Sequence, residues 1–216
     1  MEKSREMRIR TDSKSIAILA IFTSLVIALE VFPIPGITDL YTPAPSFTID
    51  WTGIPIMIVF LGLGMVFSTF MIVIMWVFIG YRNFQGAAFK GLAEAFTLLG
   101  LIIAKLILRN RDLDWKQSTV VYLIFGCLFR SLGMLAGNVF LFNLFYGMSY
   151  DAAFAFSTIY VPWNIIQAVI NVLGGIILFQ LIPENIRIQA GFGRYGAIDS
   201  KYEELSDDEL NSMNDR

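Results

Sequence analysis

Six apolar stretches, separated by short polar connections, dominate this sequence of 216 residues and constrain its fold more than any other feature. A bilayer has a hydrocarbon core about 30 Å thick, which a helix of roughly 20 apolar residues crosses. The stretches occupy residues 16–32, 53–63, 65–81, 86–108, 118–145 and 159–182. The second is short and contains Pro55. The sequence therefore predicts an all-α integral membrane protein with six transmembrane helices, the second of them a partial span.

The composition supports a membrane protein and excludes several classes of function. Hydrophobic residues make up 56% of the chain and charged residues 16%, whereas soluble domains contain about 45–50% and about 25%. The chain has no histidine and a single cysteine, Cys127. This excludes a disulfide framework, a histidine-based or multi-thiolate metal site, and Ser-His-Asp or Cys-His catalysis. The net charge of −2 argues against a nucleic-acid partner. With no Walker A sequence, we expect neither an enzyme nor a bound cofactor or metal.

Basic residues predict the orientation of the chain in the membrane. They gather before the first span, around the fourth-to-fifth connection and after the sixth span, at Lys3, Arg5, Arg8, Arg10, Lys14, Lys105, Arg109, Arg111, Lys116, Arg187, Arg194, Lys201 and Arg216. The opposite side offers only Arg82. By the positive-inside rule both termini are cytoplasmic, which requires an even number of spans. We expect a multi-pass plasma-membrane protein with a basic N-terminus (1–15), a membrane domain (16–182) and a solvated, acidic cytoplasmic tail (183–216).

Three amide side chains share one face of the sixth apolar stretch. Asn164, Gln167 and Asn171 are spaced i, i+3, i+7, and residues with this spacing lie on one side of a helix. Because amides inside a membrane need partners, the stripe either makes hydrogen bonds between helices or faces a ligand. We favour a ligand because the stripe begins beside the two outer connections. Asn138, in the outer half of the fifth stretch, adds another amide.

The first outer connection, residues 33–52, combines prolines with aromatic residues. Prolines reduce the entropy lost when a loop becomes ordered, and aromatics offer flat apolar contact. The loop therefore suits a lid over an outward-facing pocket. Tyr41 and Trp51 in this loop, and Trp76 on the third stretch, are candidates to cover a flat ligand, although aromatic residues also form interfacial belts. Lys90 and Glu94, four residues apart on the fourth stretch, are expected to neutralise each other.

Small residues recur on the first stretch at Ala20, Ser24 and Ala28. This spacing permits close approach of a second helix, from the same chain or from a partner protein.

The sequence shows no internal duplication and no row of charged residues along a helix, which disfavours a self-contained carrier, an ion channel or a proton relay. The residues thus indicate a small membrane protein with one outward pocket, whose ligand moves only with the help of partners.

Four short motifs give the chain a resemblance to a known family. They are Asp50-Trp51-Thr52-Gly53-Ile54-Pro55, Leu61-Gly62-Leu63-Gly64, Asn138-Val139-Phe140 and Pro162-Trp163-Asn164. By their order, their spacing and the six-helix frame, the chain over roughly residues 15–182 resembles the substrate-binding S components of energy-coupling factor (ECF) vitamin transporters, and among them the riboflavin-specific type. The charged tail is longer than expected of that family, and the connection between the fifth and sixth spans is shorter.

The resemblance implies a mechanism, partners and residue roles. S components bind a vitamin from the extracellular side beneath the first loop. They then associate with a membrane coupling protein and two cytosolic ATPases, and reorient in the membrane to release the vitamin inward. The residues that match the family's functional positions are Ala20, Ser24 and Ala28 for contact with the coupling protein, and Asn138, Asn164 and Gln167 for the ligand.

Riboflavin is the ligand expected from these residues, as cargo and not as a cofactor. It is neutral and flat, and its uracil-like edge offers alternating donors and acceptors, which amides such as Asn164 and Gln167 complement. A phosphorylated flavin would need a cation nearby, and the outer side offers only Arg82. A cationic vitamin such as thiamine stays open because aspartates make the outer side acidic.

Two alternatives come from other functional classes. A membrane-embedded enzyme would need a pair of catalytic groups in one cavity, for which only Lys90 and Glu94 are candidates. A non-catalytic structural subunit of a membrane complex would use the amide stripe for protein contacts. Mutation of Asn164 separates binding from assembly, since a binding role predicts lost uptake with normal assembly.

Overall fold

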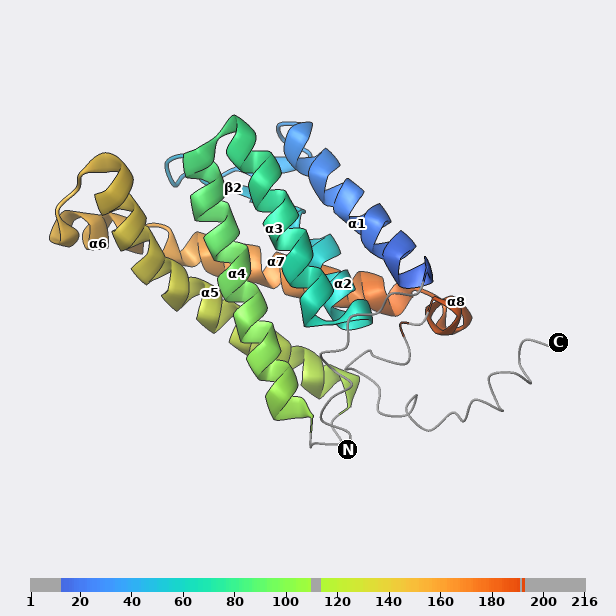
Figure 1. The fold of residues 1–216 in the computed structure, drawn as a ribbon. Coiled ribbons are helices and arrows are strands. Elements are labelled where there is room, and N and C mark those ends of the chain that lie inside the picture. The colour runs from blue at the N-terminus through green and yellow to red at the C-terminus, as the bar shows by residue number, and fades with distance from the viewer. Residues whose placement is uncertain (1–12, 110–113, 191, 193–216) are drawn as a thin grey trace.

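The computed structural model describes residues 13–109, 114–190 and 192, which form eight helices and one two-stranded sheet (Figure 1). The helices are α1 (Ser13–Val31), α2 (Gly53–Leu63), α3 (Met65–Arg82), α4 (Phe84–Leu108), α5 (Trp115–Tyr146), α6 (Tyr150–Thr158), α7 (Val161–Leu181) and α8 (Glu184–Gln189), and the strands are β1 (Asp39–Tyr41) and β2 (Thr48–Asp50). Five helices, α1, α3, α4, α5 and α7, are long and apolar enough to cross a membrane, and α2 is a shorter apolar helix. The predicted basic segment up to residue 12 and the acidic tail from residue 193 lie outside the described residues.

The six apolar helices pack into a closed ring. In this ring α1 contacts α3, α3 contacts α4, α4 contacts α5, α5 contacts α7, α7 contacts α2, and α2 returns to α1. The most extensive interface joins α4 to α5. Gly100 permits the close approach of these two helices, because a Cβ atom there would overlap the backbone carbonyl of Phe125. The predicted all-α membrane fold with a short second helix is therefore confirmed.

Burial explains why α2 remains helical although it is short. At 1.5 Å per residue, its 11 residues cover about 16 Å, roughly half the hydrocarbon thickness. Ten of the 11 are buried, so protein and not lipid surrounds the backbone groups at its ends. Gly64 then turns the chain into α3 with φ +93°, a left-handed conformation that favours glycine. Its N–H donates to the carbonyls of Val59 and Phe60, which closes the tight turn between α2 and α3.

Two connections predicted as loops contain secondary structure. In the first outer connection, β1 and β2 pair antiparallel, with Asp39 opposite Asp50. The second outer connection joins the fifth apolar stretch to the sixth. In it, α6 begins after Ser149, whose hydroxyl accepts a hydrogen bond from the N–H of Ala152 at 3.4 Å. Both elements are short, and their stability comes from contacts with the rest of the bundle. Neither has a periodic apolar pattern long enough to be recognised in the sequence.

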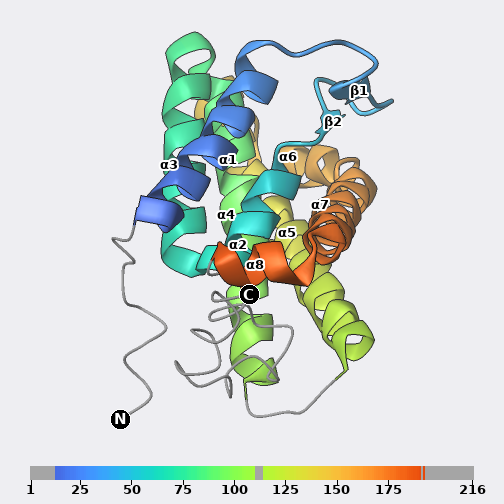
Figure 2. The ribbon, with the colours of Figure 1, turned by 90° about the vertical axis from the view of Figure 1, so that its right-hand side faces the viewer.

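The first outer connection is packed against α5, α6 and α7. Ala44 in the loop belongs to a buried apolar cluster with Phe142 of α5, Ala153 of α6 and Tyr160, which precedes α7. The Tyr160 hydroxyl also donates to the carbonyl of Pro45 at 3.0 Å. The loop therefore has a defined place over one end of the bundle, which is the end away from α8 (Figure 2).

The first residues of the predicted solvated tail belong to the fold, which corrects that expectation for them. Residues Glu184–Gln189 form α8, and Phe192 is only 4% exposed. The Phe192 ring lies 5.6 Å from that of Phe179, centroid to centroid, and covers Gly62 near the end of α2. An apolar side chain from the C-terminal segment therefore packs against the end of α2.

Candidate functional site

The amide stripe predicted on α7 is buried and faces groups from other elements. Asn164, Gln167 and Asn171 are each no more than 2% exposed. The side-chain N–H of Asn164 donates to the carbonyl of Tyr160 at 3.0 Å, and its oxygen accepts from Nε of Arg130 at 3.3 Å. A helix surrounded by lipid could not satisfy such groups, so their burial locates the polar interior of the bundle.

Gln167 ties the first outer connection to α7. Its side-chain Nε2 donates to the carbonyl of Asp50 at 2.8 Å, and its Oε1 accepts from the N–H of the same residue at 3.0 Å. The side-chain amide thus satisfies both backbone groups of Asp50 at the free edge of β2, as a neighbouring strand would. Within the loop, Thr52 donates its N–H and its hydroxyl to the Asp50 carboxylate. The β1–β2 hairpin is therefore fixed over the amide stripe.

Lys90 and Glu94 do not neutralise each other, contrary to the sequence-based expectation. Lys90 instead forms ion pairs with Glu30 of α1 and with Asp50, whose Oδ2 lies 2.9 Å from the Lys90 Nζ. Glu94 pairs with Arg130 of α5 at 2.7 Å. A pair four residues apart on one helix contributes only about 0.2–0.5 kcal/mol, whereas these partners from other elements also compensate for burial of the charges.

The Glu94–Arg130 pair joins directly to the amide stripe. Glu94 and Arg130 are 2% and 4% exposed, and one Arg130 nitrogen donates to both Glu94 and the Thr97 hydroxyl. Asn171 donates its side-chain N–H to the two oxygens of Glu94, at 3.1 and 3.3 Å. Its own oxygen accepts from Gln167 at 2.8 Å. The contacts therefore run without a break from α5 through α4 and α7 to the outer loop.

We call these groups the polar cluster, which comprises Glu30, Asp50, Lys90, Glu94, Arg130, Asn164, Gln167 and Asn171. Counted in their ordinary ionised forms, its three carboxylates and two cations give a formal net charge of −1. Although burial alone would raise the pKa of the Asp50 carboxyl, the Lys90 ammonium and the hydrogen bonds from Thr52 hold that pKa below its usual value. Asp50 is therefore ionised at neutral pH.

Four ionisable residues of the cluster lie within helices, and none of them was predicted from the sequence to belong to a ligand site. Glu30, Lys90, Glu94 and Arg130 each lie in α1, α4 or α5. Ionisable side chains are rare within transmembrane segments and usually mark functional positions. All four residues lie within the predicted spans. A search of every predicted span for ionisable residues would therefore have found them.

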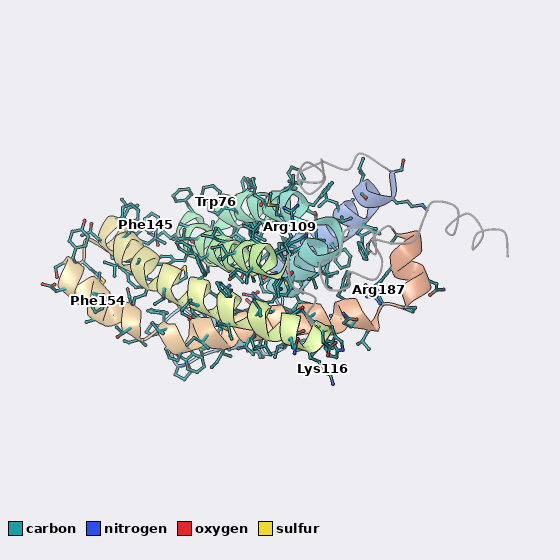
Figure 3. The ribbon with its side chains drawn as sticks, turned by 90° about the horizontal axis from the view of Figure 1, so that it is seen from below. Trp76, Arg109, Lys116, Phe145, Phe154 and Arg187 are labelled. Atoms are coloured by element: carbon teal, nitrogen blue, oxygen red, sulfur yellow. The ribbon has the colours of Figure 1, made fainter. Side chains whose placement is uncertain are left out.

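The other four residues predicted to bind the ligand lie outside the polar cluster, on α5, in the first outer connection and on α3. Asn138 is buried on α5, about two turns beyond Arg130. Trp51 is half-buried, and its indole N–H donates to the carbonyl of Ile37 at 2.6 Å within the loop. Tyr41 is 75% exposed at the end of β1. Trp76 is 45% exposed, lies against Gly91 of α4, and is seen at the edge of the bundle in Figure 3. Their roles toward a ligand stay predictions.

The small residues of α1 face away from the bundle. Ala20, Ser24 and Ala28 are all exposed, whereas Thr23 and Val26 on the opposite side are buried. The stripe is thus directed outward, towards lipid or another protein. Contact with a partner stays a prediction.

A small cavity borders the polar cluster between α2, α4 and α7, and most of its lining is apolar. It has room for about one water molecule, and Gly53, Glu94, Thr97 and Asn171 are among the residues that line it. Gly53 is essential to this arrangement, because a Cβ atom there would overlap the Asn171 amide. The start of α2 therefore packs directly against the amide stripe.

Comparison with known proteins defines the fold. No protein-family model matches the chain, and no curated protein sequence matches it. The structure, however, is similar to a crystal structure of the S component for biotin from an ECF-type ABC transporter, with a TM-score of 0.52, 85% of this chain and 95% of that chain covered, and 18% sequence identity. This chain has the S-component fold. The S-component fold places the polar cluster of this chain inside a six-helix membrane domain, with the first outer connection folded over it.

Proposed function

We propose that the chain is the substrate-binding S component of an ECF-type vitamin importer and that its ligand is riboflavin. The observation that carries the proposal is the polar cluster, in which a buried amide stripe is tied to an outer loop within an S-component fold. The solved structure of the same fold is an S component for biotin. A vitamin-sized ligand bound beneath the loop is consistent with both observations.

The first outer connection acts in this proposal as a lid. It is held by the two hydrogen bonds between Gln167 and Asp50, by the Lys90–Asp50 ion pair, and by the hydrogen bond from Tyr160. Each neutral hydrogen bond contributes about 1 kcal/mol net. The three hydrogen bonds together contribute about 3 kcal/mol and the buried ion pair about 3–5 kcal/mol more, a cost that tight binding of a ligand can offset.

The proposed orientation places the lid outside the cell. Lys116 and Arg187 lie towards one end of the structure, and Phe145 and Phe154 lie at the other (Figure 3). Figure 2 shows α8 at the opposite end from β1 and β2. By the positive-inside rule, the end that carries α8 faces the cytoplasm. Both termini are then cytoplasmic, and the ligand enters from the extracellular side.

The charges of the polar cluster favour riboflavin over an anionic ligand. Lys90 and Arg130 are already paired with carboxylates, and the cluster as a whole carries −1. A carboxylate or phosphate ligand would add a second uncompensated negative charge in a buried site. Riboflavin is neutral, and its ring edge matches side-chain amides.

The net charge of −1 also favours a second candidate, a cationic vitamin such as thiamine.

Release of the vitamin is proposed to depend on partner proteins. The partners are a membrane coupling protein, which would contact the exposed stripe of Ala20, Ser24 and Ala28, and two cytosolic ATPases. ATP hydrolysis belongs to those ATPases, so this chain is not an enzyme. Replacement of Ala20 by leucine should prevent co-purification of the coupling protein while vitamin binding is retained, because Ala20 is exposed on the lipid-facing side of α1.

Titration of the purified chain in detergent with riboflavin, thiamine and biotin tests the proposal. We expect riboflavin to bind most tightly, and Asn164→Ala to weaken its binding. Gln85→Ala is the matched control, because Gln85 is an exposed amide whose oxygen accepts only a long hydrogen bond from the Tyr146 hydroxyl, at 3.4 Å, among the described residues. Tight binding of thiamine instead would reassign the ligand. If no vitamin binds while Asn164→Ala disrupts assembly, the chain is a structural subunit.

A further inference from the structure

We infer that the buried Glu94–Arg130 ion pair is a positioning element that, together with the Tyr160 carbonyl and the backbone of Asp50, holds every amide of the α7 stripe in one direction. Through those amides it sets the pattern of hydrogen-bond donors and acceptors that a ligand meets. The effect on the amides is independent of the ligand, whereas the effect on recognition rests on the proposed function. The inference follows from the donor and acceptor capacity of each group in turn.

Arg130 fixes the first amide. A guanidinium only donates hydrogen bonds, so Asn164 must turn its side-chain oxygen toward Arg130 Nε, 3.3 Å away. The nitrogen of Asn164 then faces the carbonyl of Tyr160 at 3.0 Å, which only accepts. The two neighbours require the same orientation, so a 180° turn of this amide would break both bonds.

Glu94 sets the direction of the Asn171 amide, and Asn171 in turn sets that of the Gln167 amide. An ionised carboxylate only accepts, so Asn171 must present its nitrogen to Glu94. The oxygen of Asn171 then requires the nitrogen of Gln167, 2.8 Å away. Gln167 is left with its oxygen for the N–H of Asp50 at 3.0 Å. The Glu94 carboxylate at one end and the N–H and carbonyl of Asp50 at the other thus require the same direction for three successive contacts, the last of which reaches the outer loop.

The ion pair matters because amides are nearly symmetric in shape. The oxygen and nitrogen of a side-chain amide occupy similar volumes, so the two orientations differ mainly in their hydrogen bonds. Among the described residues the Asn164 nitrogen donates to one acceptor, the Tyr160 carbonyl, so its second N–H is available to a ligand. Gln167 donates both of its N–H groups within the protein, to Asp50 and Asn171, so it anchors the loop. The Tyr160 carbonyl and the backbone of Asp50 require the same directions, and the ion pair adds the charge-assisted bonds that make reversal of the amides more costly.

A double substitution, Glu94→Gln with Arg130→Gln, tests the inference. Removal of one charge alone would leave the other buried without a partner, whereas removal of both does not. The control is Ser131→Ala, because Ser131 is buried beside Arg130 on α5 and its hydroxyl has no hydrogen-bond partner among the described residues. The first readout needs no ligand: the rate at which the side-chain N–H groups of Asn171 and Gln167 exchange with deuterated water, followed by NMR in detergent. We expect exchange at least about tenfold faster in the double variant than in the control, corresponding to the loss of about one net hydrogen bond.

The second readout is discrimination between riboflavin and its N3-methyl analogue, which lacks the donor of the uracil-like edge. We expect the unchanged chain and the control to prefer riboflavin by about tenfold, the equivalent of one hydrogen bond, and the double variant to lose most of this preference. The conservative variants Glu94→Asp and Arg130→Lys, which keep a carboxylate and a cation, should restore it.

The two readouts separate this inference from the proposed ligand. Faster exchange in the double variant supports the inference even if riboflavin does not bind, in which case only the ligand assignment fails. Unchanged exchange in a folded double variant would overturn it, since the ion pair would then be structural alone. If the double variant does not fold, Glu94→Asp decides: slow exchange with a retained preference supports the inference, and slow exchange with a lost preference contradicts it.

Discussion

Replacement of Gly53 by alanine gives the sharpest structural test of the polar cluster. Gly53 is the first residue of α2, and a methyl group there would overlap the amide of Asn171. Because Gly53 is buried and its neighbours belong to the closed ring of helices, the amide must move. In moving, it leaves Glu94 and Gln167, the two groups that it bonds at 3.1 and 2.8 Å.

The expected cost follows from those two bonds. A hydrogen bond to a charged group contributes about 1.5–3 kcal/mol and a neutral one about 1 kcal/mol. Bonds between membrane helices average only about 0.6 kcal/mol, but the higher values apply here because Glu94 is charged and stays buried. The gain in helix propensity from glycine to alanine returns about 1 kcal/mol. The net destabilisation is about 2 kcal/mol, which lowers the melting temperature by about 4–8 °C for a chain of this size.

Thermal unfolding in detergent, with riboflavin binding measured on the same samples, checks this prediction. Gly80→Ala in α3 is the matched control, because its new methyl group would lie 3.6 Å from the Cβ of Ala87, an ordinary contact. We expect the control to melt at or slightly above the temperature of the unchanged chain. If Gly53→Ala melts as late as the control and binds riboflavin equally well, the packing of α2 on the amide stripe is wrong.

Three further predictions concern the rest of the fold. Lys90→Met leaves the carboxylates of Glu30 and Asp50 buried without a cation, so we expect a destabilisation of about 3–5 kcal/mol in thermal unfolding, and Lys90→Arg should recover most of it. Phe192→Ala removes a buried ring beneath α2 and should cost about 3 kcal/mol by the same assay; an unchanged melting temperature would show that the C-terminal segment is not anchored. Trp76→Ala alters a side chain that is 45% exposed, so the riboflavin Kd should stay within about twofold, and a larger loss would place Trp76 in the site.

The sequence predicts the helical frame well because the bilayer sets a physical length for each span. Apolar runs of that length leave few alternatives, so five helices were located within a few residues of their observed ends. The short α2 was recognised for the same reason, because its apolar run is too short for a full span. The amide stripe was also visible, since Asn164, Gln167 and Asn171 lie on one face by spacing alone.

Contacts between residues far apart in sequence were beyond this kind of prediction. Asp50 and Gln167 are separated by 117 positions, and the partners of Lys90 come from α1 and β2. Local rules favoured Glu94 as the partner of Lys90, because they consider only one helix at a time. The anchoring of Phe192 was missed similarly, because its polar surroundings in the sequence gave no sign of the space beneath α2.

The absorbance spectrum of the purified chain tests the central claim most directly. The chain is purified in detergent from cells grown with riboflavin, its visible spectrum is recorded, and any small molecule released on denaturation is identified. We predict a stoichiometric flavin in the unchanged chain and its loss in Asn164→Ala. A colourless chain that also fails to bind added riboflavin would contradict the flavin assignment, and binding of thiamine by that chain would replace it.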